Sequence, residues 1–262
     1  MTEWNAVEYA RLSALQAAMA EEALSLLDLR GTESVLDIGC GNGKITEEIA
    51  ARVPQGRVVG VDASAKMIAF ATENAPPLAD SNLKFAVADA RHLSFKAEFD
   101  LIVSFNALHW IPDQALALES IRAAIKPAGR AQLRLVPKGE RKSLEDVIDE
   151  TRLSQPWKEY FVGFHDPYLH LTPEQYASLA KQHGFEVLRV HTADKSWDFQ
   201  SRAAFAALGA VTFIEWTQHL AEAARPDFVS DVLERYEKVA CTRPGEENYF
   251  RFYQMDITLA PA

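Results

Sequence analysis

The stretch VLDIGCGNG, residues 35–43, decides the fold. Its apolar start is typical of a buried β-strand, and its alternating glycines predict a tight turn into a helix. Glycine lets the backbone approach a ligand closely, and the N–H groups that begin the next helix stay available to bind it. A turn without a ligand needs only one such glycine, so the pattern favours a ligand-binding loop over simple chain reversal. Lys44 stands where a G-x-G-x-x-G dinucleotide loop has its third glycine, which counts against NAD or FAD.

Two acidic residues follow later predicted strands. Asp62 ends the apolar run 58–61, and Asp89 comes after the predicted strand 83–87. The carboxyl ends of parallel strands meet at one edge of a sheet, so we expect both acids beside the glycine turn. Asp62 then suits the two hydroxyls of a ribose, and Asp89 suits the amino group of an adenine. The alternatives are a strand-end cap for Asp62 and an N-cap for Asp89.

Short apolar runs alternate with helical segments through the first half of the chain. The predicted strands are 34–38, 57–61, 83–87, 99–105 and 131–136, and the predicted helices between them are 44–52, 65–74 and 114–125. This alternation predicts an α/β fold with a parallel sheet covered by helices on both faces. A leading helix lies within 5–29. Beyond Pro137 we expect helices near 143–153, from Thr172 to Gly184, and at 201–224 and 227–239, with strands at 186–192 and 250–259.

The order of these segments resembles the class I S-adenosylmethionine-dependent methyltransferases. The matching pieces are VLDIGCGNG (35–43), VVGVDAS (58–64), FAVADARHL (85–93), FDLIVSFNALHW (99–110) and IKPAGRAQLRLV (125–136). The last departs at Ala128, where such enzymes often have glycine, although Gly129 remains. The resemblance implies a Rossmann-like, seven-stranded sheet with one antiparallel strand, here 250–259, and S-adenosylmethionine as cofactor, with S-adenosylhomocysteine as product.

We predict that the cofactor lies along the glycine turn and the acids at the strand ends. Its amino-acid end is expected at Gly39 and Gly41, its ribose at Asp62, and its adenine at Asp89, packed against Met67. The full set of predicted cofactor residues is Gly39, Cys40, Gly41, Asp62, Ala63, Met67, Asp89, Ala90 and Asn106.

Outside this core the chain is similar to small-molecule carboxylate methyltransferases of the juvenile hormone acid type and, less closely, the trans-aconitate type. RLSALQ (11–16), SFNALHWIPDQ (104–114) and QPWKEYFVGFHDPY (155–168) carry the resemblance. In those enzymes a glutamine and a tryptophan at the matching positions bind the acceptor's carboxylate, which implies this catalytic role for Gln16 and Trp110. Both side chains offer neutral N–H donors. The alternatives are that Trp110 anchors the helix after its strand and that Gln16 caps a neighbouring loop.

Aromatic residues gather between 156 and 170. We expect a single domain, 1–262, with a cofactor-binding core at 32–136 and an aromatic-rich helical substrate cap formed by 137–183 and 198–247. A cap would exclude water from the acceptor. The predicted substrate contacts are Tyr9, Gln16, Trp110, Trp157 and Phe161, although each cap ring could instead form the core of the insertion.

The resulting hypothesis is methyl transfer to the carboxylate of a small apolar or isoprenoid-like acid, giving an ester. A carboxylate with a pKa of about 4 is already ionised at neutral pH, so it needs desolvation and in-line placement but no base. The alternative acceptor is a phenol, amine or activated carbon, with His109 as catalytic base. If His109 is not the base, we expect it to be a buried or cofactor-adjacent side chain that lines the site and forms hydrogen bonds. A binding protein without catalysis is a third possibility, against which the intact Gly39, Gly41 and Asp62 argue.

Composition argues against other classes. The chain has 262 residues with 37 acidic and 27 basic side chains, a net charge of −10 that disfavours a nucleic-acid partner. Cys40 and Cys241 lack zinc-site spacing, and the histidines around Asp166 match no metal motif, so no metal is expected. The acidic N-terminus is unlike a signal peptide, and no apolar run approaches the roughly 18 residues of a membrane span. We therefore expect a cytoplasmic protein that acts on a small-molecule acceptor without a membrane partner.

Overall fold

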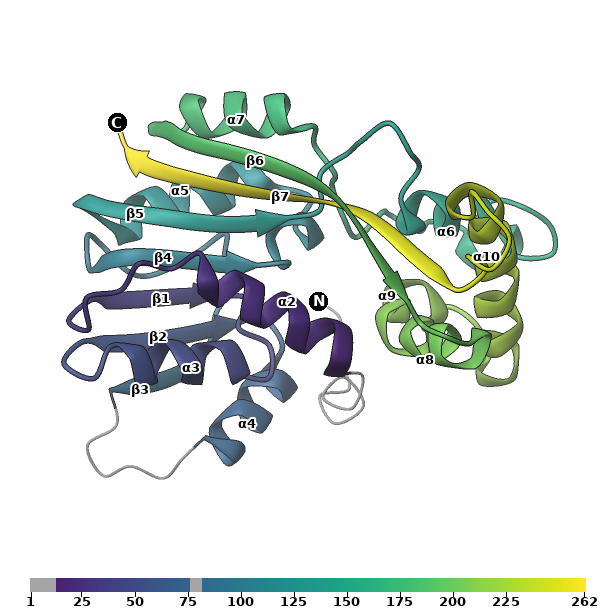
Figure 1. The fold of residues 1–262 in the computed structure, drawn as a ribbon, viewed down its shortest axis with the longest axis horizontal. Coiled ribbons are helices and arrows are strands. Elements are labelled where there is room, and N and C mark those ends of the chain that lie inside the picture. The colour runs from purple at the N-terminus through teal and green to yellow at the C-terminus, as the bar shows by residue number, and fades with distance from the viewer. Residues whose placement is uncertain (1–12, 76–81) are drawn as a thin grey trace.

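The computed structural model describes residues 13–75 and 82–262, and a seven-stranded sheet lies at its centre (Figure 1). Its strands are β1 (Ser34–Ile38), β2 (Arg57–Asp62), β3 (Leu83–Val87), β4 (Phe99–Phe105), β5 (Ile125–Leu135), β6 (Phe185–Asp198) and β7 (Tyr249–Pro261). They lie in the order β3-β2-β1-β4-β5-β7-β6. The pairs among β1 to β5 are parallel, whereas β7 is antiparallel to both β5 and β6. This confirms the predicted mostly parallel sheet with one antiparallel strand.

Helices flank the sheet, and side chains cap several of their N-termini. They are α2 (Ser13–Ser25), α3 (Lys44–Arg52), α4 (Ala65–Asn74), α5 (Gln114–Ala124), α6 (Leu144–Arg152), α7 (Pro173–Gln182), α8 (Arg202–Thr212), α9 (Ile214–Thr217) and α10 (Arg225–Ala240), with short 3-10 helices η1 (Leu108–Trp110), η2 (Lys158–Phe161) and η3 (Glu222–Ala224). α7 begins after Thr172, as predicted, and Thr172 forms a capping box with Gln175. The predicted helix 201–224 is instead divided at Phe213, whose buried ring packs over Gly209 in the last turn of α8.

Side chains of the central strands point alternately to two apolar layers. Leu36 and Ile102 pack in the layer that contains α5 and α7. Val35 and Val103 pack in the opposite layer, which contains α2 and α3. Because both faces are covered, the strands are apolar almost throughout, which is why sequence alone locates them well.

β6 and β7 continue past the other strands toward a second helical body (Figure 1). We call this body, formed by α6, η2, α8, α9 and α10, the cap; its buried side chains form an apolar cluster of their own. The cap does not follow the predicted boundaries completely. α7, which lies within the expected insertion 137–183, packs on the sheet core through Tyr176 and Ala180. The long antiparallel ribbon also extends β6 to Asp198, beyond the predicted end at 192.

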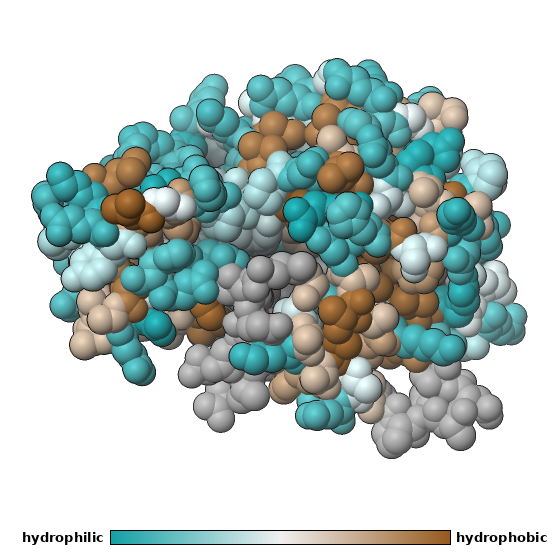
Figure 2. All heavy atoms as spheres, turned by 180° about the vertical axis from the view of Figure 1, so that it is seen from behind, coloured by the Kyte–Doolittle hydropathy of each residue, from teal (hydrophilic) through white to brown (hydrophobic). Residues whose placement is uncertain are grey.

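Polar side chains cover much of the face seen in Figure 2, with apolar residues showing between them. Within 13–75 and 82–262, no helix combines the length and the apolar character needed to cross a membrane.

Candidate active site

The glycine turn connects β1 to α3 and leaves one side of its backbone open. Gly39 and Gly41 have φ of 74° and 54°, in the left-handed region that favours glycine. A Cβ on Gly39 would lie 2.2 Å from the Ala107 Cβ, whereas a Cβ on Gly41 would meet nothing within 4 Å. Gly43 differs, since a Cβ there would lie 2.7 Å from the Phe85 ring. Gly39 and Gly43 thus permit close packing, and Gly41 gives a ligand access to the backbone.

Asp62 joins the end of β2 to this turn. Its Oδ2 accepts the Gly41 N–H at 3.0 Å, and its Oδ1 accepts the Ser64 N–H at 2.8 Å. Ser64 in turn caps α4 by accepting the Met67 N–H at 3.2 Å. The carboxylate therefore orders the turn in addition to facing the cavity described next.

A cavity of about 360 Å³ lies at the carboxyl ends of β1, β2, β3 and β4. Eight of the nine predicted cofactor residues line it: Gly39, Gly41, Asp62, Ala63, Met67, Asp89, Ala90 and Asn106. The open side of Gly41, the carboxylates and the apolar Met67 suit the amino-acid, ribose and adenine parts of S-adenosylmethionine. We call this space the cofactor cavity. Cys40 is the exception, because it lies on the wall of the second cavity.

Arg91 is a lining residue that the sequence analysis did not single out. Its Nε lies 3.0 and 3.1 Å from the two Asp89 oxygens, and its Nη2 donates to Asp89 Oδ2 at 2.6 Å. This hydrogen bonding is the main reason that the pKa of the Asp89 carboxyl is lowered. An adenine amino group at Asp89 would therefore share the carboxylate with a guanidinium.

A second cavity of about 280 Å³ adjoins the first. The two share the lining residues Gly39, Gly41, Phe105, Asn106 and Trp110. Most of the remaining wall comes from α2, the cap and the beginning of β7, and these segments contribute mainly apolar side chains: Leu15, Met19, Ala20, Leu144, Ile148, Leu208, Phe213, Trp216, Phe250 and Phe252. The glycine turn, the start of α3, η1 and the end of β5 supply the others, among them Cys40, Lys44, His109 and Val136. We call it the acceptor cavity. Its junction with the cofactor cavity is where a methyl group could pass between two bound molecules.

Asn106 marks that junction. It follows β4 with φ of 58°, unusual for a residue other than glycine, and its N–H donates to the Arg134 carbonyl at 2.9 Å. Its Oδ1 is buried and has no hydrogen-bond partner among the described residues. This backbone turn leads into η1, which places His109 and Trp110 against the cavities.

Trp110 stands in an aromatic wall. Its ring centroid lies 6.1 Å from that of Trp216 and 6.4 Å from that of Tyr168. Asp149 of α6 holds both partners, since it accepts hydrogen bonds from Trp216 Nε1 at 3.2 Å and from the Tyr168 hydroxyl at 3.1 Å. Sequence reasoning missed Asp149 because an acid in a polar helix carries no signal of such contacts.

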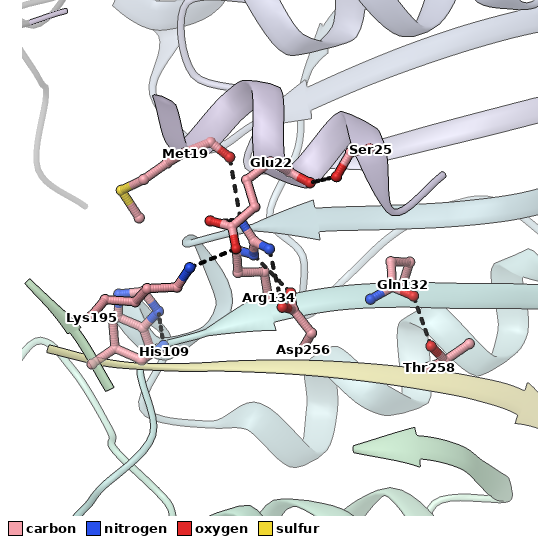
Figure 3. Close-up of polar contacts among 10 residues, drawn as sticks. Met19, Glu22, Ser25, His109, Gln132, Arg134, Lys195, Asp256 and Thr258 are labelled. Carbon is pink, nitrogen blue, oxygen red and sulfur yellow. Dashed lines mark hydrogen bonds and ion pairs between the residues drawn. The ribbon is translucent and has the colours of Figure 1, made fainter. Parts of the chain in front are cut away.

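His109 is buried, with only 3% of its surface exposed. Its Nδ1 accepts the Val136 N–H at 3.4 Å (Figure 3). Burial, and then the nearby His170, lower the pKa of His109 well below its usual value. The imidazole is therefore neutral at neutral pH, and the hydrogen bond at Nδ1 places its proton on Nε2. His109 also lines the acceptor cavity.

Trp157 and Phe161 do not line either cavity. Both belong to the buried cluster of the cap, where Trp157 Nε1 donates to Asp231 at 2.7 Å and the Phe161 ring packs against Phe228. This corrects their assignment as substrate contacts: the cap reaches the cavity through other residues, among them Leu208 and Trp216. Which aromatic rings of the cap line the cavity depends on how α6 and α10 pack. The spacing of the rings in the sequence does not reveal that packing.

Two other predicted contacts fall where less is described. Tyr9 lies outside the described residues. Gln16 lies in α2, one position from the cavity residue Leu15, but its side chain is outside the described part. Among the described residues, no group of three histidine, cysteine, aspartate or glutamate side chains is placed to hold a metal ion.

Comparison with known proteins shows that the chain is similar to methyltransferases. Residues 35–129 match the family described as a methyltransferase domain. Trans-aconitate 2-methyltransferase of Deinococcus radiodurans is 29% identical over 264 residues, covering 95% of both chains. The enzyme of the same name from Shigella flexneri is 33% identical over 129 residues, 49% of each chain.

Solved structures share the fold. Phosphoethanolamine N-methyltransferase 2 of Haemonchus contortus, in complex with S-adenosyl-L-methionine, superposes with a TM-score of 0.58 at 22% identity, covering 92% of this chain and 53% of that one. The [4+2]-cyclase SpnF superposes with a TM-score of 0.60 at 19% identity, covering 94% and 80%. Since proteins with different named activities share it, the fold alone does not fix the reaction.

Proposed function

We propose that this chain, an S-adenosylmethionine-dependent methyltransferase of the class I fold, methylates the carboxylate of a small apolar acid. One observation carries the proposal: a mostly apolar acceptor cavity opens onto the cofactor cavity beside Trp110. An apolar tail would be buried among side chains of α2 and the cap, which leaves the polar head of the acid at the junction.

The chain's residues have two tasks in this reaction. S-adenosylmethionine supplies a methyl group on a positively charged sulfur, and the carboxylate oxygen takes that group as the carbon–sulfur bond breaks. Gly41 in the glycine turn, Asp62 at the end of β2 and Asp89 just after β3 would hold the cofactor. Trp110 and Gln16 would donate neutral hydrogen bonds to the acid, so that the carboxylate is oriented without the tight ion pair an arginine would form.

Charge on the cavity wall favours an acid with a single carboxylate. Among its described lining residues, the only charged side chains are the cation Lys44 and the anion Glu145. Lys44 is exposed, and it is the only positively charged side chain among the described lining residues. An acid with several carboxylates would therefore find only one cation to pair with among these residues. A tricarboxylate such as trans-aconitate, the acid named for two of the relatives, would have to be desolvated beside Glu145 with little compensation.

A phenol, amine or carbon acceptor would need a base, and His109 does not suit that task. Its Nδ1 already accepts a backbone N–H, and its pKa lies well below the usual value. A carboxylate acceptor needs no such base, so the state of His109 agrees with the proposed reaction.

The test is a panel of acceptors incubated with purified protein and S-adenosylmethionine labelled in the methyl group. The panel contains octanoate, dodecanoate, trans-aconitate, para-cresol and hexylamine. We expect labelled methyl esters from the apolar acids, identified by their release of methanol in base, and little product from trans-aconitate. Trp110→Phe is the matched control, since it keeps the ring but removes the indole N–H. Turnover of the cresol or the amine with none of the acids would refute the proposal.

A further inference from the structure

Helix α2 spans two different environments. Near its C-terminal end, Leu24 is buried in the layer against α3, and the Leu24 carbonyl accepts a hydrogen bond from Arg52 at 3.0 Å. Toward its N-terminal end, Leu15 and Met19 form part of the acceptor-cavity wall. The helix is thus fixed to the sheet at one end, and its other end closes the cavity.

Between these ends α2 meets a buried ion pair (Figure 3). Arg134 at the end of β5 is fully buried, and its Nε and Nη2 lie 2.7 and 3.0 Å from the two oxygens of Asp256 on β7. Its remaining nitrogen, Nη1, donates to the Met19 carbonyl at 3.3 Å. The Arg134 carbonyl accepts the Asn106 N–H at 2.9 Å. One residue therefore contacts both α2 and the junction of the cavities.

Glu22 adds a second connection. One of its oxygens lies 3.7 Å from Arg134 Nη1, and the other accepts from Lys195 Nζ of β6 at 2.7 Å. Burial raises the pKa of Glu22, but the Lys195 hydrogen bond and the Arg134 charge outweigh it and hold the pKa below its usual range. Glu22 is therefore ionised at neutral pH and bridges cations from β5 and β6.

We infer that Glu22 is a positioning residue, which holds α2 against Arg134 and Lys195 so that Leu15 and Met19 close the acceptor cavity. It lines neither cavity itself. The inference rests on the proposed function for the identity of the acceptor, but not for the position of the helix. Loss of Glu22 should weaken acceptor binding and leave cofactor binding intact, because no described side chain of α2 lines the cofactor cavity.

The experiment compares Glu22→Ala with Glu21→Ala. Glu21 is the exposed neighbour on the same helix, so both variants remove one carboxylate and gain the same helix propensity. Arg134 is left intact, because its removal would strand Asp256 without its partner inside the protein. Three quantities are measured: hydrogen exchange of residues 15–25, S-adenosylhomocysteine affinity by calorimetry, and KM and kcat for dodecanoate.

For Glu22→Ala we expect exchange in α2 and KM for dodecanoate to rise about three- to tenfold, the scale for a partly buried ion pair. Cofactor affinity should stay within about twofold, and Glu21→Ala should match the wild type in every measurement. Lys195→Met should produce a smaller change in the same direction. Equal exchange in the two glutamate variants would overturn the inference. If dodecanoate is not a substrate, the exchange result still decides the position of α2, whereas the proposed acceptor fails separately.

Discussion

Replacing His109 distinguishes a catalytic base from a neutral hydrogen-bond donor. Two variants divide the functions of the ring. Asn at this position can accept the Val136 N–H, as Nδ1 does, but lacks the donor of Nε2. Gln can present a donor near the place of Nε2 but leaves the Val136 N–H without its acceptor. Because Asn keeps an acceptor for the Val136 N–H, we expect the Asn variant to fold as the wild type does.

The size of the loss in kcat/KM distinguishes a neutral donor from a catalytic base. Loss of a neutral donor costs about 0.5–1.5 kcal/mol, which corresponds to a roughly 2- to 13-fold lower kcat/KM. Loss of a general base costs about 10²- to 10⁴-fold. We expect the smaller effect for His109→Asn, because a carboxylate acceptor has no proton to remove.

The assay is kcat/KM for dodecanoate between about pH 6 and pH 9, at saturating cofactor. The pKa of His109 lies well below 6.5, so its protonation should produce no inflection in this range. The wild type and His109→Asn should give parallel profiles. A loss of more than about 100-fold, together with an inflection that is present only in the wild type, would assign His109 as the base and refute the carboxylate mechanism.

Two further predictions concern the two cavities, and a third concerns the buried carboxyl of Asp37. Asp62→Ala should weaken S-adenosylmethionine binding by about 1.5–3 kcal/mol, since charge-assisted hydrogen bonds are lost, and calorimetry that found unchanged affinity in a folded variant would contradict this. Gln16→Ala and Trp110→Phe should each lower turnover of an acid by roughly 5- to 150-fold with cofactor affinity nearly intact; wild-type rates in both would exclude the proposed carboxylate contacts. Burial raises the pKa of Asp37 to about 7 despite a hydrogen bond from Thr46. The folded state then binds more protons than the unfolded chain, so the free energy of unfolding should fall as the pH rises from about 4 to 7. Asp37→Asn should flatten this dependence in urea titrations, and equal slopes in both proteins would count against the shift.

Local sequence signals located the strands and most of the cofactor cavity, whereas the seven-stranded sheet with one antiparallel strand was expected from the family resemblance. The predicted bounds 44–52, 65–74 and 99–105 coincide with α3, α4 and β4. Apolar periodicity, glycine spacing and strand-end acids act over a few residues, and the parallel topology then brings the strand ends together. Asp62 and Asp89 could be placed in one cavity for this reason. No sequence signal indicated that Arg91 would form hydrogen bonds with the Asp89 carboxylate.

By itself the sequence determined the order of strands and helices, the glycine turn and the acids beside it. Only the tertiary structure decided which rings of the cap line a cavity. Trp157 pairs with Asp231 and packs in the cap core, whereas Trp216 faces the acceptor cavity. The tertiary structure also brings together Arg134 and Asp256, which stand 122 positions apart in the chain. Contacts between distant segments depend on which helix faces meet once the sheet has formed, and side-chain periodicity within one helix does not contain that information.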